Sequence, residues 1–181
     1  MFASFRFVLL KKLLKLLAEW EFRIGGVSRN HFLRRYLRYM NISHGNQVTV
    51  GVDVHIRNRG NLSLGERCGI GSFARIWNYA PITIGDDFLA AGGLTLNSST
   101  HDPVTLEPRG MPIDIGNRVW CGVNVTILAG VTIGDDTVIG AGSVVANDIP
   151  SNSIAAGVPA RKVKDLDRTS APQIWRWSEL P

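Results

Sequence analysis

The chain has 181 residues, which is enough for one domain with a substantial hydrophobic core. Its 45% of hydrophobic and 19% of charged residues exclude an intrinsically disordered protein. The formal net charge of +5 is unevenly spread, because residues 1–42 hold nine Lys and Arg against two acidic residues, so the main body is not basic.

Residues 1–20 are predicted to form an amphipathic helix, and the FRIGG string that follows ends it, with Gly25 and Gly26 as stop signals. A narrow polar face (Ser4, Lys11, Lys12, Lys15 and Glu19) lies opposite a wide apolar one (Phe2, Phe5, Val8, Leu9, Leu13, Leu16 and Leu17). Because lysines break the apolar run, no transmembrane helix is expected, and the segment lacks the cleavage site of a secretory signal. A second short helix is expected within residues 30–40.

Two interpretations of this basic arm, residues 1–44, remain open. In the first, its apolar face packs on the body or on a neighbouring subunit. In the second, residues 1–40 make a peripheral membrane contact, with apolar side chains inserted and Lys and Arg on anionic headgroups. Nucleic-acid binding is not expected, because the basic residues alternate with long aliphatic side chains and form no known binding motif.

From residue 45 onward a six-residue period replaces the helical pattern. Apolar residues follow it without a gap late in the chain (Ile115, Cys121, Ile127, Ile133, Ile139 and Val145) and recur earlier (Leu64, Ile70, Ile76, Ile84, Ala90 and Leu96, faintly Val50 and Ile56). Glycine often comes next, where a turning backbone benefits from the missing Cβ. Since six residues suit a short strand and a turn but no helix face, we predict a three-sided β-solenoid over residues 45–155.

The period also predicts which side chains meet inside the solenoid. With three repeats in each coil, Ile115 stacks on Ile133, Cys121 on Ile139, and Ile127 on Val145. Cys121 is then a packed inward thiol, and Cys68 also takes an inward position, so neither is expected to act as a nucleophile. Two cysteines without a disulfide framework suit a reducing compartment.

The period is interrupted once, after Leu96. It returns only at Ile115, so the residues DPVTLEPRGMPID are inserted, and we predict a projecting loop over residues 102–114. His101 comes directly before this loop, at an outward or corner position. Loops held on rigid scaffolds often carry binding residues, so His101 is the first candidate for a functional side chain.

The strings VWCG, GAGSVV and AAGVPAR are similar to those of the hexapeptide-repeat acyltransferases. Over roughly residues 45–165 the chain resembles their galactoside/maltose acetyltransferase branch and its polysaccharide O-acetyltransferase relatives. The resemblance implies an all-β fold, a left-handed parallel β-helix built of hexapeptide repeats, assembled as a homotrimer. We further expect a short C-terminal helix within residues 156–181, followed by a tail in which Trp175 and Trp177 pack on a neighbouring subunit or stack on a sugar.

The resemblance also implies roles for particular residues. His101 matches the general base that removes the proton of an attacking hydroxyl, a role that histidine suits near neutral pH. Acetyl-CoA as co-substrate would lie in a groove between two subunits, at positions that match Trp120, Val123, Ala141, Ala146, Asn147, Arg161 and Lys164. Arg161 and Lys164 suit phosphates, whereas Asn147 departs from the lysine common at its position. Candidate acceptor contacts are Asn78, Asn97 and Asp102.

A metal site is not expected, because the other histidines, His31, His44 and His55, lie in or near the arm and about three ligands must converge. The sequence thus predicts a cytoplasmic O-acetyltransferase that acts on a sugar hydroxyl of a cell-surface polysaccharide or of its lipid-linked precursor. Three alternatives stay open: an N-acetyltransferase of a nucleotide sugar or amino acid, a non-catalytic β-helix assembly subunit, and a metal-dependent lyase or hydratase.

Overall fold

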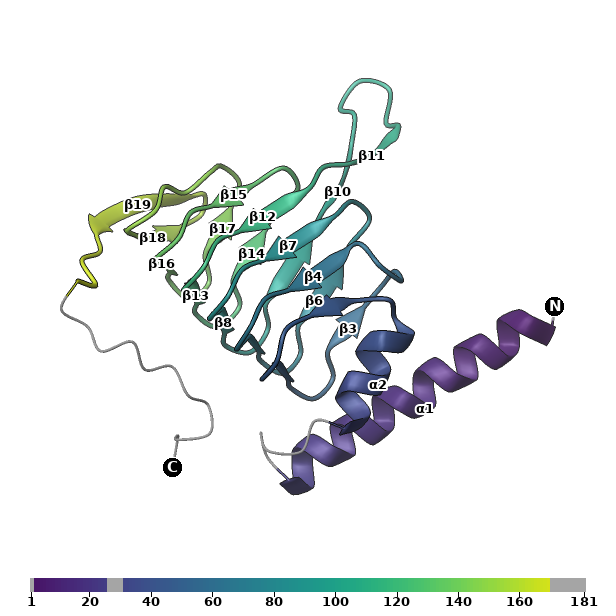
Figure 1. The fold of residues 1–181 in the computed structure, drawn as a ribbon. Coiled ribbons are helices and arrows are strands. Elements are labelled where there is room, and N and C mark those ends of the chain that lie inside the picture. The colour runs from purple at the N-terminus through teal and green to yellow at the C-terminus, as the bar shows by residue number, and fades with distance from the viewer. Residues whose placement is uncertain (1, 26–30, 170–181) are drawn as a thin grey trace.

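The structure, a computed structural model, describes residues 2–25 and 31–169. Two helices, α1 (Phe2–Gly25) and α2 (His31–Tyr39), precede a parallel β-helix (Figure 1). The strands of its first sheet are, in spatial order, β1 (Ser43–His44), β4 (Leu62–Leu64), β7 (Ile82–Ile84), β12 (Ile113–Ile115) and β15 (Thr132–Ile133).

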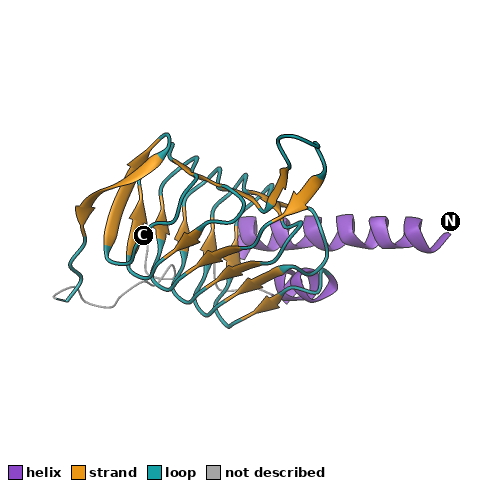
Figure 2. Ribbon diagram, turned by 90° about the horizontal axis from the view of Figure 1, so that it is seen from above, coloured by secondary structure: helices purple, strands orange, loops and turns teal. Residues whose placement is uncertain are grey.

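The other two walls of the solenoid are built in the same way (Figure 2). The second sheet has seven strands: β2 (Thr49–Val50), β5 (Gly69–Ile70), β8 (Leu89–Ala90), β13 (Trp120–Cys121), β16 (Thr137–Ile139), β18 (Ser153–Gly157) and β19 (Ala160–Asp165). The third sheet has five: β3 (His55–Ile56), β6 (Arg75–Trp77), β9 (Thr95–Asn97), β14 (Thr126–Ile127) and β17 (Val144–Val145). Each coil passes through one strand of every sheet, which confirms the predicted three-sided solenoid.

The predicted interior stacking is also confirmed. Ile115 is in register with Ile133 in the first sheet, and Cys121 with Ile139 in the second. In the third sheet Ile127 is in register with Val145. These side chains belong to one continuous hydrophobic core that runs the length of the β-helix. The six-residue period is therefore the spacing at which the chain returns a side chain to this core.

The glycines that follow the inward residues serve close packing between coils more than turning. A Cβ placed on Gly71 would lie 2.5 Å from the backbone carbonyl carbon of Ala91 in the next coil, and one on Gly122 would lie 2.7 Å from the backbone nitrogen of Ala141. The left-handed backbone conformations fall elsewhere in the corners, at residues such as Asn124. Glycine is needed at residues 71 and 122 because neighbouring backbones nearly touch there.

Polar side chains tie consecutive coils together at the corner between the first and second sheets. The Asn117 Oδ1 accepts a hydrogen bond from the Asp86 backbone N–H at 2.9 Å, and Asp135 Oδ1 accepts one from the Asn117 N–H at 2.8 Å. Beside them, Arg118 binds both oxygens of Asp136 at 2.6 and 2.7 Å. This guanidinium holds the pKa of Asp136 below its ordinary value, so the corner is fully paired at neutral pH.

The two helices cover the N-terminal end of the solenoid (Figure 1). The side chains of Leu33, Tyr36, Leu37 and Met40 are buried and join the core of the first coil, so α2 closes the open end. The helix α1 lies across α2 and the first coil. Neither helix, within the described residues, is long and apolar enough to cross a membrane.

The structure corrects the sequence-based expectations at two places. The inserted segment is a hairpin in which β10 (Ser99–His101) pairs antiparallel with β11 (Pro108–Gly110), so the excursion begins before residue 102. The predicted short C-terminal helix is wrong for residues 156–169. There, β18 pairs with β16 and extends the second sheet. The next strand, β19, folds back and pairs antiparallel with β18, so the outer edge of β18 is covered. Trp175 and Trp177 lie outside the described residues.

We predict that Gly71→Ala lowers the free energy of unfolding by about 2 kcal/mol, because the added Cβ meets backbone atoms that cannot move without separating two coils. Chemical denaturation followed by circular dichroism measures this. Gly92→Ala is the matched control, since the nearest atom to its Cβ is the Ser72 carbonyl oxygen at 3.3 Å. Equal effects of the two substitutions would contradict the close-packing explanation.

We also predict that both thiols are unreactive in the folded protein. Burial raises the pKa of Cys68 to about 11 and that of Cys121 to about 12, so hardly any thiolate is present near pH 8. Ellman's reagent should release colour only after denaturation. A Val163→Cys variant, with its new thiol on an exposed position of β19, should react at once. Rapid reaction of the folded wild-type protein would contradict the buried placement.

Candidate functional site

The candidate site begins where the third sheet continues into the hairpin. From β9 to β10 the backbone stays nearly extended, so side chains alternate between its two sides. Ser98 points inward and is fully buried, where its hydroxyl bonds the backbone of Ala80 and Trp77. Asn97, Ser99 and His101 therefore share the outer side, and the Asn97 Oδ1 accepts hydrogen bonds from the Ser99 N–H and hydroxyl at 3.0 and 2.6 Å.

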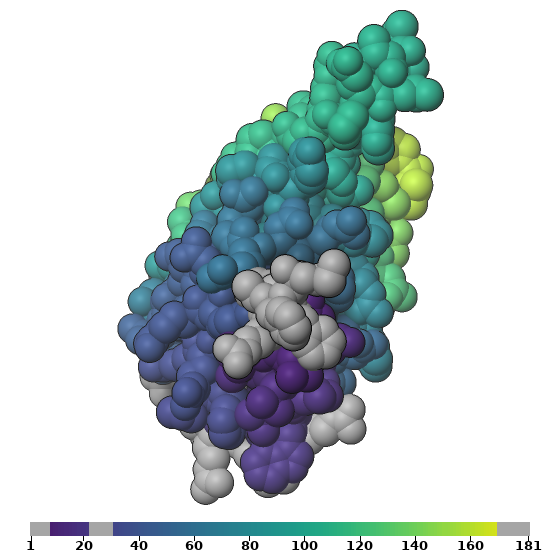
Figure 3. Space-filling model, turned by 90° about the vertical axis from the view of Figure 1, so that its right-hand side faces the viewer, coloured from purple at the N-terminus to yellow at the C-terminus, as the bar shows by residue number. Residues whose placement is uncertain are grey.

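His101 ends β10 and is exposed, opposite Pro108 of β11. Figure 3 shows the hairpin standing out from the body of the solenoid. Within the described ranges, the His101 imidazole has no hydrogen-bond partner. The structure thus places an exposed histidine at the end of β10, outside the core and on the same side of the extended backbone as Asn97 and Ser99, as the sequence predicted.

Asp102, predicted as an acceptor contact, is engaged within the hairpin. Its Oδ1 accepts hydrogen bonds from the N–H groups of Val104 and Thr105, both at 2.9 Å, and its Oδ2 pairs with Arg109 at 2.7 Å. The hydrogen bonds from Thr105 and Val104 lower the pKa of Asp102, which keeps the carboxylate ionised. The contacts of Asp102 therefore shape the turn that follows His101.

The structure adds two aromatic residues that the sequence did not single out. Trp77 of β6 is in register with Asn97 of β9, so the indole stands next to the Asn97 side chain on the outer face and is partly exposed. The exposed Tyr79 ring lies against the hairpin base, where a Cβ on Gly110 would come within 3.0 Å of it. The sequence could have indicated Trp77 as a surface residue of the site, because it directly follows the inward Ile76 in the six-residue period.

Asn78, predicted as an acceptor contact, lies in the interior. It is fully buried, and its Oδ1 accepts a hydrogen bond from the Asn58 N–H at 2.9 Å. Its Nδ2 donates to the carbonyl oxygens of Asn58 and Gly60. These bonds connect the corners of two consecutive coils, so the side chain has no surface that an acceptor could touch in this structure.

The candidate coenzyme residues divide among three places. Val123 and Ala141 occupy the same corner of consecutive coils, between the second and third sheets, and both are exposed. Arg161 joins them there, because it pairs with Ala156, which lies beside Gly140. A Cβ on Gly142 of this corner would meet no atom within 4 Å, so the backbone is open to a ligand. This edge fits a chain-like ligand with phosphates.

The remaining candidates lie on either side of that edge. Trp120 and Lys164 share the outer line of the second sheet, which runs through Val138 and Ile154 between them. Ala146 and Asn147, both exposed, follow β17 at the opposite edge of the third sheet. One protomer therefore does not gather the predicted coenzyme residues into one groove.

The described histidines are dispersed. The His44 Nδ1 contacts its neighbouring carbonyl at Gly45, and His55 lies on the first coil. In the ranges 2–25 and 31–169, no group of three or more His, Cys, Asp or Glu side chains is arranged to hold a metal ion.

Comparisons with known proteins agree with this architecture. The family described as Bacterial transferase hexapeptide (six repeats) matches residues 112–147. The galactoside O-acetyltransferase of Escherichia coli K12 is 50% identical over 92 residues, which are 48% of this chain and 45% of that relative, so the match spans about half its length. The putative lipopolysaccharide biosynthesis O-acetyl transferase WbbJ of the same organism is 34% identical over 152 residues, covering 74% of this chain and 76% of the relative.

Two solved structures extend the comparison to the fold. A maltose O-acetyltransferase from Clostridium difficile 630 superposes with a TM-score of 0.74 at 30% identity, covering 87% of this chain and 85% of the other. A galactoside acetyltransferase in complex with coenzyme A gives a TM-score of 0.60, also at 30% identity, over 87% and 82% of the two chains. These matches confirm the predicted left-handed hexapeptide β-helix. With its periodic core, its projecting β10–β11 hairpin and these relatives, the chain belongs to the hexapeptide-repeat acyltransferases.

Proposed function

We propose that this chain is an acetyl-CoA-dependent O-acetyltransferase whose acceptor is a sugar hydroxyl, and that His101 is its general base. The observation that carries the proposal is the exposed position of His101, on the same side of the extended β9–β10 backbone as Asn97 and Ser99. The relatives named for galactoside and maltose O-acetylation and for lipopolysaccharide biosynthesis support a sugar acceptor, and the bound coenzyme A of one structural neighbour supports the donor.

The proposed reaction needs one proton acceptor in the right place. A ring nitrogen of His101 takes the proton of the acceptor hydroxyl while that oxygen bonds to the thioester carbonyl carbon. The carbon–sulfur bond then breaks, and the imidazolium returns its proton to the departing sulfur. The buried Cys68 and Cys121 thiols are out of reach of the thioester, which supports direct transfer of the acetyl group to the acceptor over an acyl-enzyme on cysteine.

The order of side chains along the third sheet supports separate places for the two proposed substrates. At the end of its strands, Trp77, Asn97, Leu128 and Ala146 follow one another in consecutive coils. Adjacent strands lie about 4.8 Å apart, so Ala146 is about 10 Å from Asn97 on the C-terminal side. If Ala146 contacts the coenzyme, the acceptor lies on the N-terminal side, where Trp77 offers an aromatic face for a sugar ring.

The division of the candidate coenzyme residues among two edges and the second sheet supports a homotrimer in which neighbouring protomers complete each groove. The edge with Val123, Ala141 and Arg161 would face the opposite edge, with Ala146 and Asn147, of another copy. We place the enzyme in the cytoplasm, where acetyl-CoA is made, and take its acceptor to be a cell-surface polysaccharide or its lipid-linked precursor. A lipid-linked acceptor would bring the reaction to the inner face of the cell membrane.

His101→Ala should lower acceptor-dependent turnover by about 100-fold or more, because it removes the general base. Release of free CoA thiol, measured over sugars, amines and lipid-linked glycans, reports the loss. His31→Ala is the matched control, since His31 is an exposed histidine at the far end of the molecule, on α2.

The same panel separates the alternatives. Transfer to amines in preference to hydroxyls would replace the proposal with an N-acetyltransferase. Wild-type protein that does not bind acetyl-CoA would favour the non-catalytic assembly subunit. Equal turnover of His101→Ala and wild type would remove His101 from the mechanism.

Trp77→Ala should raise KM for the acceptor about tenfold and leave KM for acetyl-CoA unchanged, because the lost aromatic face contacts only the acceptor. Trp120→Ala should show the reverse pattern, since Trp120 lies with the donor residues on the second sheet. Steady-state kinetics with each substrate varied in turn distinguishes the two. A shared pattern in both variants would show that Trp77 does not separate acceptor from donor.

A further inference from the structure

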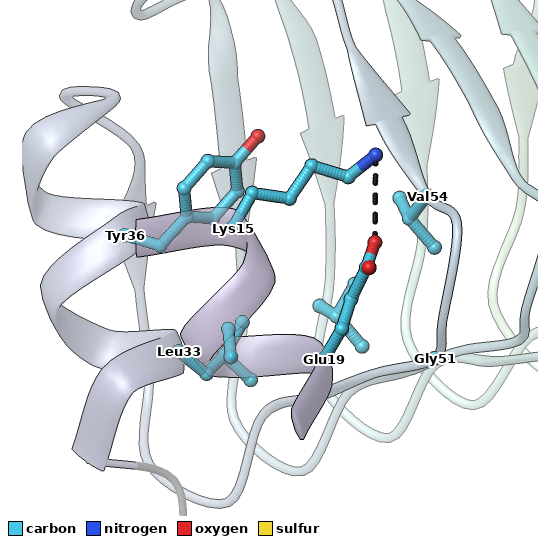
Figure 4. A pocket seen from close by; sticks show the side chains of 8 residues that line it. Lys15, Glu19, Leu33, Tyr36, Gly51 and Val54 are labelled. Atoms are coloured by element: carbon cyan, nitrogen blue, oxygen red, sulfur yellow. Dashed lines mark ion pairs between the residues drawn. The ribbon is translucent and has the colours of Figure 1, made fainter. Parts of the chain in front are cut away.

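The helix α1 is docked through its polar edge. The Lys11 Nζ donates a hydrogen bond to the Ile56 carbonyl oxygen at 3.1 Å, at the end of the first coil. Glu19 accepts one from the Asp53 N–H at 3.0 Å and pairs with Lys15 at 3.4 Å, beside a small cavity between the helices and the first coil (Figure 4). Three side chains of the narrow polar face, Lys11, Lys15 and Glu19, thus face the protein.

Leu14 is buried in the core, but most of the large apolar side chains described on α1 point the other way. Leu9, Leu13, Leu16 and Trp20 recur at steps of four, three and four residues, which places them along one side of the helix. They are 59%, 51%, 62% and 57% exposed. Leu10, also exposed, widens this apolar stripe to an arc of about 120°. We refer to these five residues as the α1 stripe.

The N-terminal part of α1 also stands clear of the body. Three consecutive residues, Val8, Leu9 and Leu10, are all exposed, although consecutive helical residues point about 100° apart. Figure 2 shows α1 extending beyond the end of the solenoid. Apolar side chains on several sides of the helix are therefore open to solvent to a large extent at this point.

Several exposed cations of the two helices are not neutralised within the part of the chain that the structure describes. The two acids of this segment are used internally: Glu19 contacts Lys15 and the Asp53 N–H, and the Glu21 carboxylate accepts hydrogen bonds from the first N–H groups of α2. The exposed basic residues have no acidic partner among the described residues (Lys12, Arg34, Arg35 and Arg38). This end of the molecule combines exposed leucines with uncompensated positive charge.

We infer that the α1 stripe inserts into the surface of an anionic lipid bilayer, with Lys12 and the α2 arginines on the headgroups. The wide arc suits an interfacial helix, whereas a helix pair buries a narrower line of side chains. A symmetric contact between copies would also bring the same uncompensated cations together. The inference does not depend on the proposed function, because vesicle binding requires neither acetyl-CoA nor His101.

The test is co-sedimentation of the full chain with vesicles of phosphatidylcholine, with and without phosphatidylglycerol. Wild type should bind the anionic vesicles, and Leu13→Glu with Leu16→Glu should weaken binding about tenfold or more. Val158→Glu with Val163→Glu is the matched control: it makes the same charge change at two exposed aliphatic residues at the other end of the molecule. Arg34→Gln with Arg35→Gln should weaken binding about fivefold per charge, on anionic vesicles only.

Sedimentation velocity and thermal unfolding of each variant accompany the binding assay. Unchanged mass and melting temperature, with selective loss of vesicle binding, support the inference. Wild-type protein that does not bind anionic vesicles overturns it. So does an α1 variant that falls apart into smaller species while its vesicle binding stays equal to that of the control, since the stripe would then be a contact between subunits.

Discussion

Parallel strand pairing holds consecutive coils of this chain at one fixed spacing, about 4.8 Å, and most other features follow from it. At that spacing the backbones at Gly71 and Ala91 leave no room for a Cβ. Each inward position stacks on an inward position of the next coil, so the core accepts apolar side chains that fit one above the other, such as Cys121 and Ile139. The same spacing brings residues at the corners of consecutive coils close enough to pair, as Arg118 and Asp136 do.

The fixed spacing also explains why the site lies where it does. Inserted residues cannot be accommodated within a coil, so the segment between Ser99 and Gly110 leaves the wall as a hairpin. The hairpin takes His101 with it, and the Asp102 carboxylate closes the turn through three contacts. The wall beneath supplies Asn97 and Trp77 from neighbouring strands. The hairpin is thereby joined to the third sheet of the β-helix at the place where we propose that the reaction occurs.

The sequence predicted those features that depend on the period, and failed where a contact depends on the path of a corner. Ile115, Cys121 and Ile127 were predicted to face inward, and their partners were predicted correctly, because the stacking is a regular repeat. Asn78 was misplaced, because its inward rotation is set by hydrogen bonds to the coil below. Residues 160–165 form a strand because an open sheet edge was available, which no local pattern reveals. A helical projection found both faces of α1 but could not tell which one meets the body.

Because the coils rise by a constant distance, the number of coils between two elements fixes how far apart they lie along the axis of the β-helix. Lys11 joins α1 to the first coil at Ile56, and His101 leaves the wall after Leu96, two coils further along the same sheet. That separation is about 10 Å and cannot stretch, because every intervening strand is hydrogen-bonded to the next. With α1 resting on a surface, the imidazole would reach only groups held at one distance above it. The number of coils between the helix and the hairpin would then decide which unit of an anchored chain is modified.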